Sequence, residues 1–245
     1  MISVVLFAFP LLAVAHESEP INTEFASPLA RRTANLNLDF QHFRGRVDED
    51  IAGIDFEYGV ASRMQFAAGI PLAHRSLSSG QSVTGAGNLS LSYRYLLAGG
   101  NKKVFAVSIN PEAEFPTGNP GIAERAYSTG AAIHVDAHRG DKLWFHSNWG
   151  YETPVAHFDE KENNFNFAMA GMYKVTESLH SVIEVFGRHE FNKSLTEMSI
   201  APEVIYSIGK HWELKAAVPL GATSSTPSAG IQFRATWKIG PSERQ

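Results

Sequence analysis

The chain has 245 residues, a net charge of −4 at pH 7 and no cysteine. One domain is expected at this length, and the mildly acidic balance argues against nucleic-acid binding, which needs a basic face. Without cysteine there is no disulfide scaffold, so an exported chain of this size needs stability from another source, such as a closed hydrogen-bonded sheet.

Residues 1–15 are expected to be a secretory signal peptide of the Sec type. The stretch from Val4 to Ala15 is almost wholly apolar and ends in the small-residue cleavage site Ala13-Val14-Ala15. Residues 16–32 then form a periplasmic N-terminal lead, in which His16 and Glu17 are expected to be disordered rather than part of a site. No later stretch offers about 18 uninterrupted apolar residues, so the sequence predicts no membrane-spanning helix.

The body of the chain alternates apolar and polar residues with a period of two. The pattern is clearest in Ala34 to Phe40 and in Leu89 to Tyr95. Because successive side chains of a strand point to opposite faces, each such segment has one apolar and one polar face. The pattern predicts twelve strands, near 33–43, 51–60, 64–72, 87–97, 103–115, 126–138, 142–152, 164–174, 178–188, 198–208, 212–220 and 229–239.

The connections between these strands alternate between short and long. Ala61-Ser62-Arg63 and Arg139-Gly140-Asp141 are short, whereas 73–86 and 154–163 are long and rich in Gly, Ser, Pro and Asn. Short periplasmic turns and longer outer loops are typical of outer-membrane barrels. The fold expected over 33–239 is therefore all-β, a membrane-spanning antiparallel up-and-down β-barrel of about 12 strands. Residues 240–245 form a polar C-terminal tail.

Aromatic residues on the predicted apolar face gather at the two strand ends. At the short-turn end these are Tyr58, Tyr95, Tyr173, Tyr206, Trp212 and Trp237, and at the long-loop end Phe115, Trp149, Tyr151 and Phe165. Two aromatic belts are typical of the two membrane interfaces. The alternative is a soluble β-sandwich, which has no reason to sort its aromatic residues to strand ends.

Several stretches resemble a known family. They are the hairpin Phe56 to Phe66, the strand Gly85 to Tyr95 with Asn88 where Asp is usual, Phe115-Pro116-Thr117-Gly118, and Ala201 to Tyr206. They resemble the outer-membrane transporters named for the MetA pathway of phenol degradation. The resemblance implies an outer-membrane β-barrel, carries over no catalytic residues and names no substrate.

The predicted inner face carries charges of both signs. Strand parity places eight candidate lumen or selectivity residues there: Asp55, Glu57, Arg94, Glu112, Glu114, Arg188, Glu203 and Arg234. The three arginines are expected to face Glu112, Glu114 and Glu203. Such charges line a solute path in an open barrel, or lock a closed one through salt bridges. A barrel of twelve strands lies between filled and open barrels, so both alternatives stand.

A histidine cluster is a weak candidate for a metal site. His134, Asp136 and His138 share one face of a strand, and a turn at 139–141 would place His146 directly opposite His134. Two imidazoles and a carboxylate can hold Zn²⁺ or Cu²⁺. The favoured interpretation is that these are ordinary polar lumen residues, with no metal and no cofactor.

An enzyme is not expected. Barrel lipid hydrolases share a His-x-Ser-Asn element, whereas this chain reads His146-Ser147-Asn148 with no spacer. Without the spacer His146 and Ser147 point to opposite faces, so no nucleophile–base pair forms.

The sequence therefore favours an outer-membrane channel or porin-like transporter of a Gram-negative-type bacterium, for passive uptake or export of small molecules through a charged lumen. The alternatives are a closed structural or surface-binding barrel that acts through its loops and, less favoured, a lipid-modifying enzyme. The expected partners are outer-membrane lipid, the barrel-assembly machinery and a small solute that the sequence does not identify. A monomer is expected.

Overall fold

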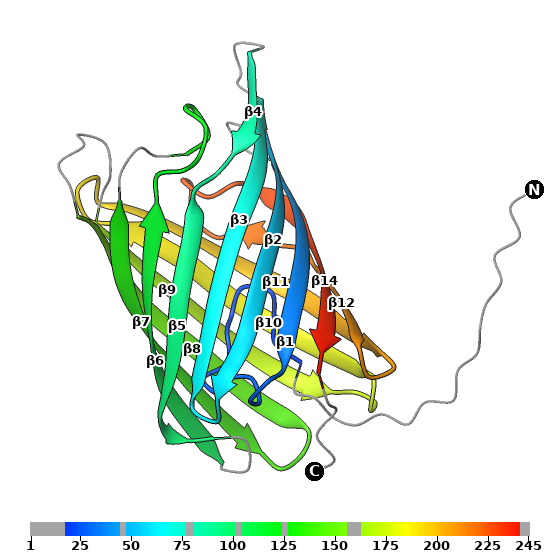
Figure 1. Cartoon of the computed structure of the whole chain (residues 1–245). Helices are drawn as coiled ribbons and strands as arrows, with labels where there is room; N and C mark the ends of the chain where they lie inside the picture. Colours follow the sequence, from blue (N-terminus) through cyan, green and yellow to red (C-terminus); the bar gives the residue numbers. More distant parts are fainter. Residues whose placement is uncertain are drawn as a thin grey trace, which may run out of the picture.

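The chain folds into a closed antiparallel β-barrel of twelve strands, which confirms the predicted fold class (Figure 1). The computed structural model describes residues 18–44, 48–76, 81–100, 104–123, 127–155 and 163–240. The predicted signal peptide and residues 241–245 lie outside them. The strands are β1 (Ala34–Arg44), β2 (Asp48–Ala61), β3 (Met64–Ser76), β4 (Ser82–Ala86), β5 (Leu89–Gly99), β6 (Phe105–Phe115), β7 (Ser128–Arg139), β8 (Leu143–Pro154), β9 (Asn164–Lys174), β10 (Leu179–Glu190), β11 (Leu195–Ile208), β12 (Trp212–Ala217), β13 (Leu220–Gly221) and β14 (Ala229–Ile239).

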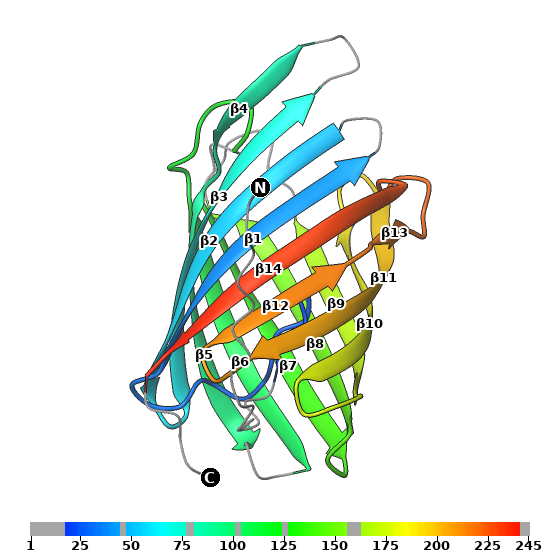
Figure 2. The same ribbon diagram turned by 90° about the vertical axis from the view of Figure 1, so that its right-hand side faces the viewer.

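The first and last strands close the barrel. β1 pairs with β2 on one side and with β14 on the other, from Ala34 opposite Ile239 to Arg44 opposite Ala229 (Figure 2). The short strand β13 follows β12 and pairs with β11 and β14. Closure gives every barrel strand two partners, which a structure in lipid requires because no water is there to pair with an open edge.

One predicted loop is partly a strand pair. The sequence placed residues 73–86 in a connection, but β3 continues to Ser76 and pairs with β4 from Leu72 opposite Ala86 to Ser76 opposite Ser82. This ribbon rises beyond the long-loop end of the barrel (Figure 1).

The burial pattern is inverted relative to a soluble protein. Ile183 and Val204 are 53% and 49% exposed, whereas their neighbours Glu184 and Glu203 are 0% and 2% exposed. Apolar side chains thus cover the outside and polar ones fill the inside, as the alternation predicts for a barrel in lipid. The described residues contain no helix long and apolar enough to cross a membrane.

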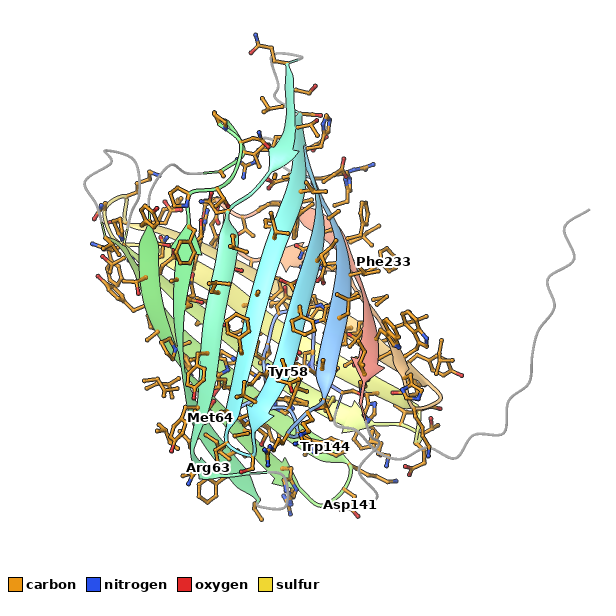
Figure 3. All side chains as sticks on the ribbon, in the orientation of Figure 1. Tyr58, Arg63, Met64, Asp141, Trp144 and Phe233 are labelled. Carbon is orange, nitrogen blue, oxygen red and sulfur yellow. The ribbon has the colours of Figure 1, made fainter. Side chains whose placement is uncertain are left out.

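The tyrosines and tryptophans predicted for the short-turn end all point outward, but outward aromatic residues are not confined to the strand ends, since Phe40, Phe56 and Phe233 are exposed in the middle of β1, β2 and β14. Tyr58 lies on the wall near the short-turn end, which Arg63 and Met64 mark, and Phe233 lies farther up the apolar band (Figure 3). Tyr58 is 38% exposed, Trp149 41% and Phe233 49%. In the aromatic belt at the short-turn end, Trp212 stacks on Trp237, its cross-strand partner, with ring centroids 6.0 Å apart.

Candidate channel lumen

Residues 18–33 run inside the barrel, and we call them the plug (Figure 1, blue segment before β1). Because this stretch forms no strand pairing of its own, its N–H groups need acceptors. Side chains of the inner wall supply them: Ile21 N donates to Glu203 at 3.2 Å, Asn22 N to Glu184 at 3.1 Å, Ala26 N to Asp136 at 2.8 Å and Leu29 N to Gln65 at 2.8 Å.

The plug also packs through its apolar residues. Ile21 and Phe25 are 6% and 8% exposed. Ile21 packs with Ala201 and Ala217, and Phe25 with a second cluster that includes Met172 and Ile205. The sequence analysis placed 16–32 in a periplasmic lead and did not predict this course. Two features of the sequence could have indicated this course: the bulky apolar residues Ile21 and Phe25 in the supposed lead, and the excess of carboxylates on the inner face of the barrel.

Arg94 of β5 is the main ionic contact between wall and plug. It is 4% exposed, forms an ion pair with Glu24 and lies 3.8 Å from a carboxylate oxygen of Glu19. Glu24 and Glu19 both belong to the plug. A buried guanidinium needs such partners, since an unpaired ion out of water is costly. The partners expected from the sequence for Arg94 were Glu112, Glu114 and Glu203.

The remaining arginine candidates pair within the wall. Arg234 of β14 donates to Asp39 of β1 at 2.6 Å, directly across the strand pair that closes the barrel. Arg188 lies at the long-loop end, where its guanidinium contacts Glu197 at 2.9 Å and Glu190 at 3.1 Å.

The carboxylate candidates lie at different heights. Glu57 accepts from Asn35 at 2.9 Å, and Asp55 lies next to it along the inner face of β2, beside Gly69 of β3. Glu114 accepts from Asn88 at 2.6 Å near the long-loop end. Glu203 accepts from the plug. Glu112 lies in the wall of a cavity above the plug.

An ionic cluster that includes Glu213 fixes the first described residue of the plug. Glu213 is 1% exposed and contacts Lys215 at 3.2 Å and Lys238 at 2.9 Å. The hydroxyl of Ser18 donates to the same carboxylate at 2.6 Å. The plug is therefore held along its length by contacts that are noncovalent and mainly polar.

The free space inside the barrel is divided by the plug. A cavity of about 500 Å³ occupies the long-loop half, with Asn22 and Glu24 of the plug in its lining. At the level of the plug, a space beside Glu19 and Arg94 measures about 40 Å³ and another beside Ser27 and His146 about 20 Å³. A cavity needs about 10–15 Å³ of such volume to hold one water molecule, so each of these two spaces has room for only a few water molecules.

The predicted pairing of the histidines is wrong by two residues. His134 lies opposite Asn148, and His146 lies opposite Asp136, with its Nδ1 2.9 Å from a carboxylate oxygen. The turn occupies residues 140–142 rather than 139–141, because Arg139 still pairs with Leu143 and Gly140 takes the positive φ of 63° that the turn requires. The described residues contain no group of three or more His, Asp or Glu able to hold a metal.

The strand geometry also separates His146 and Ser147, the two residues considered as a catalytic base and nucleophile. His146 is 4% exposed inside the barrel, and Ser147, the next residue of β8, points to the opposite face. A hydrogen bond between a nucleophile and a base is not available to this pair.

Comparison with known proteins supports the fold. No protein-family model and no curated protein matches the chain. The COG4313 outer membrane channel from Pseudomonas putida F1 has a similar structure, with 11% identity, a TM-score of 0.74 and coverage of 87% of this chain and 98% of that one. NanC porin is 8% identical, with a TM-score of 0.58 and coverage of 84% of this chain and 100% of that one. KdgM porin is 10% identical, with a TM-score of 0.56 and coverage of 84% of this chain and 99% of that one. The resemblance to the MetA-pathway family stays a prediction.

Proposed function

We propose that this chain is a channel of a bacterial outer membrane that passes small molecules, and that the plug closes its lumen in the conformation described. The observation that carries the proposal is the plug itself, a stretch inside a closed barrel held by noncovalent and mainly polar contacts. Such contacts can be exchanged for water when the segment withdraws. The charged inner face then lines the path, and passage is passive diffusion past Arg94, Glu203 and Arg234.

The proposed location follows from the outer surface. The inverted burial and the two aromatic belts suit a bilayer, and the similar structures include porins and outer-membrane channels. The proposal also includes export through the predicted signal peptide and insertion by the barrel-assembly machinery. In outer-membrane lipid the barrel is then a monomer.

A second candidate is a barrel that stays closed and acts through its outer loops. The small spaces at the level of the plug favour it. The two candidates differ in one property, namely whether the plug leaves the lumen.

The deciding experiment is a single-channel recording in planar bilayers with the full chain and two substitutions. Arg94→Gln removes the buried cation that pairs with Glu19 and Glu24; because the Glu24 side chain is 50% exposed, the loss is smaller than the cost of breaking a fully buried ion pair, about 3–5 kcal/mol. We expect Arg94→Gln to raise the open probability at least tenfold over the unsubstituted protein. Arg188→Gln makes the same charge change at the long-loop end, away from the plug, and is expected to leave the open probability unchanged.

Folding of each protein is checked by heat-modifiable gel migration. Folded protein without current in all three cases would establish the closed barrel instead. Equal current in all three would show a conducting lumen that the plug does not control.

A further inference from the structure

The plug enters and leaves the lumen at the same end of the barrel. At its start, Ser18 contacts Glu213, the second residue of β12 after a short turn. At its finish, Thr33 leads directly into β1, where Ala34 pairs with the belt residue Tyr58 at the short-turn end. Between these points the segment rises inside the barrel and returns (Figure 1). The plug is therefore a loop inserted from the short-turn side, and it withdraws toward that side.

The part of this loop that lies deepest in the lumen is anionic. Glu19 and Glu24 both face Arg94, which lies half-way along β5, and Glu24 also lines the cavity in the long-loop half. The two cationic residues of the plug, Arg31 and Arg32, are exposed at the short-turn mouth, where Arg32 N donates to the backbone of β2 at 2.8 Å. Withdrawal of the loop therefore moves two negative charges from the middle of the barrel toward the short-turn side.

A voltage across the membrane acts chiefly at the level of the plug. The cavity above the plug measures about 500 Å³, whereas the two spaces beside it measure about 40 and 20 Å³. Because spaces that hold only a few water molecules carry little ionic current, most of the potential difference falls across this level. One elementary charge that moves through the full difference changes an equilibrium about fifty-fold per 100 mV.

We infer that the plug is a voltage-sensitive gate, which opens when the short-turn side of the membrane is positive. A positive potential on that side attracts Glu19 and Glu24 and draws the loop out of the lumen, whereas a negative potential holds the loop in place. The charges of the wall, such as Arg94, experience the same field but do not move with the plug. The inference rests on the proposed function and adds to it the stimulus that opens the channel.

The test is to record the open probability of the full chain in planar bilayers as a function of voltage. Recordings are made at pH 8, because burial raises the pKa of the Glu19 carboxyl to about 7 and the group must be ionised. All proteins carry Lys210→Cys in the turn between β11 and β12, which is their only thiol because the chain has no cysteine. This thiol is coupled to biotin, and the chamber from which streptavidin lowers the current is the one that the short turns face.

We expect the ratio of open to closed time to rise at least about tenfold per 100 mV as the short-turn side becomes positive. Glu24→Gln removes one of the two moving charges, so it should halve the slope of the logarithm of this ratio against voltage.

The matched control is Glu203→Gln, which makes the same change on the wall. Glu203 accepts from Ile21 N at 3.2 Å, so this variant also weakens docking of the plug. It is expected to shift the midpoint voltage and to leave the slope unchanged, because the carboxylate it removes does not move. A lost contact changes the midpoint in either variant, and the slope alone reports a moving charge.

Three results would overturn the inference: an equal rise at both polarities, a rise when the short-turn side is negative, or equal slopes in Glu24→Gln and Glu203→Gln. Current that does not depend on voltage would also overturn it and would leave the channel standing. No current from folded protein at either polarity would refute the channel itself, and the gate with it.

Discussion

Arg94 shows how a single buried charge connects the barrel wall to the plug. Its guanidinium is 4% exposed, and its described partners, Glu19 and Glu24, both come from a segment that precedes the first strand. Two carboxylates of the wall also bind the plug, because Glu184 and Glu203 accept hydrogen bonds from its backbone N–H groups. Some inner charges of this conformation thus serve as partners for an internal segment, whereas others, such as Arg234 and Asp39, pair with each other within the wall.

Glu19 gives the plug a dependence on pH. The pKa of its carboxyl is raised from the usual 4.5 to about 7, chiefly by burial and then by the charges of Glu57 and Glu24, while Arg94 and Lys215 act to lower it. An acid whose pKa is higher in the docked plug binds its proton more tightly there than in the withdrawn plug. Docking is therefore strongest at acidic pH, weakens as pH rises from 4.5 towards 7 and levels off above.

We expect the open probability in planar bilayers to rise between pH 5 and pH 7 and to change little from pH 7 to pH 8. Glu19→Gln keeps the shape of the side chain and removes its titration, so its open probability should be nearly constant over this range. An equally steep profile in Glu19→Gln would assign the effect to another group.

At the scale of the elements, tight turns set the register of the hairpins. Gly140 has φ of 63° in the turn between β7 and β8, and Gly209 has φ of 62° between β11 and β12. No other atom lies within 4 Å of a Cβ added at either position, so the restriction is one of backbone conformation rather than of space. The left-handed conformation costs an L-residue with a Cβ about 1–2 kcal/mol.

Gly140→Ala is therefore expected to lower the free energy of unfolding of the barrel by about 1 kcal/mol. Gly140→Asn should cost less, because asparagine tolerates the left-handed conformation. Guanidinium unfolding in lipid vesicles, followed by tryptophan fluorescence, measures both. Equal losses in the two variants would show that the turn conformation is not the cause.

The elements also show what the sequence can predict and what it cannot. The two-residue alternation predicts the strands because lipid on one face and polar groups on the other act on each residue locally. The register of β7 on β8 was missed because an error of one residue in the turn shifts every cross-strand pair by two. The plug was missed because it depends on partners distant in sequence, such as Ser18 and Glu213, 195 residues apart.

At the scale of the whole molecule, the apolar outer band is the feature that commits the barrel to a membrane. Ile183 and Ile208 test it as a pair, since they are 53% and 47% exposed and differ chiefly in height. Leu179 lies opposite the belt residue Tyr206, so Ile183 is four residues into the band, whereas Ile208 lies two residues beyond the belt, next to the short turn.

An arginine near the middle of the bilayer costs about 2–4 kcal/mol, and one near the interface about 0–1 kcal/mol. We therefore expect Ile183→Arg to lower the free energy of unfolding in lipid vesicles by about 2–4 kcal/mol and Ile208→Arg by at most about 1 kcal/mol. Ile183→Leu, which keeps the position apolar, should be close to neutral. If the two arginine variants lose the same amount, the band does not coincide with the bilayer core. If neither loses stability, the outer face meets water, and the membrane location itself is refuted.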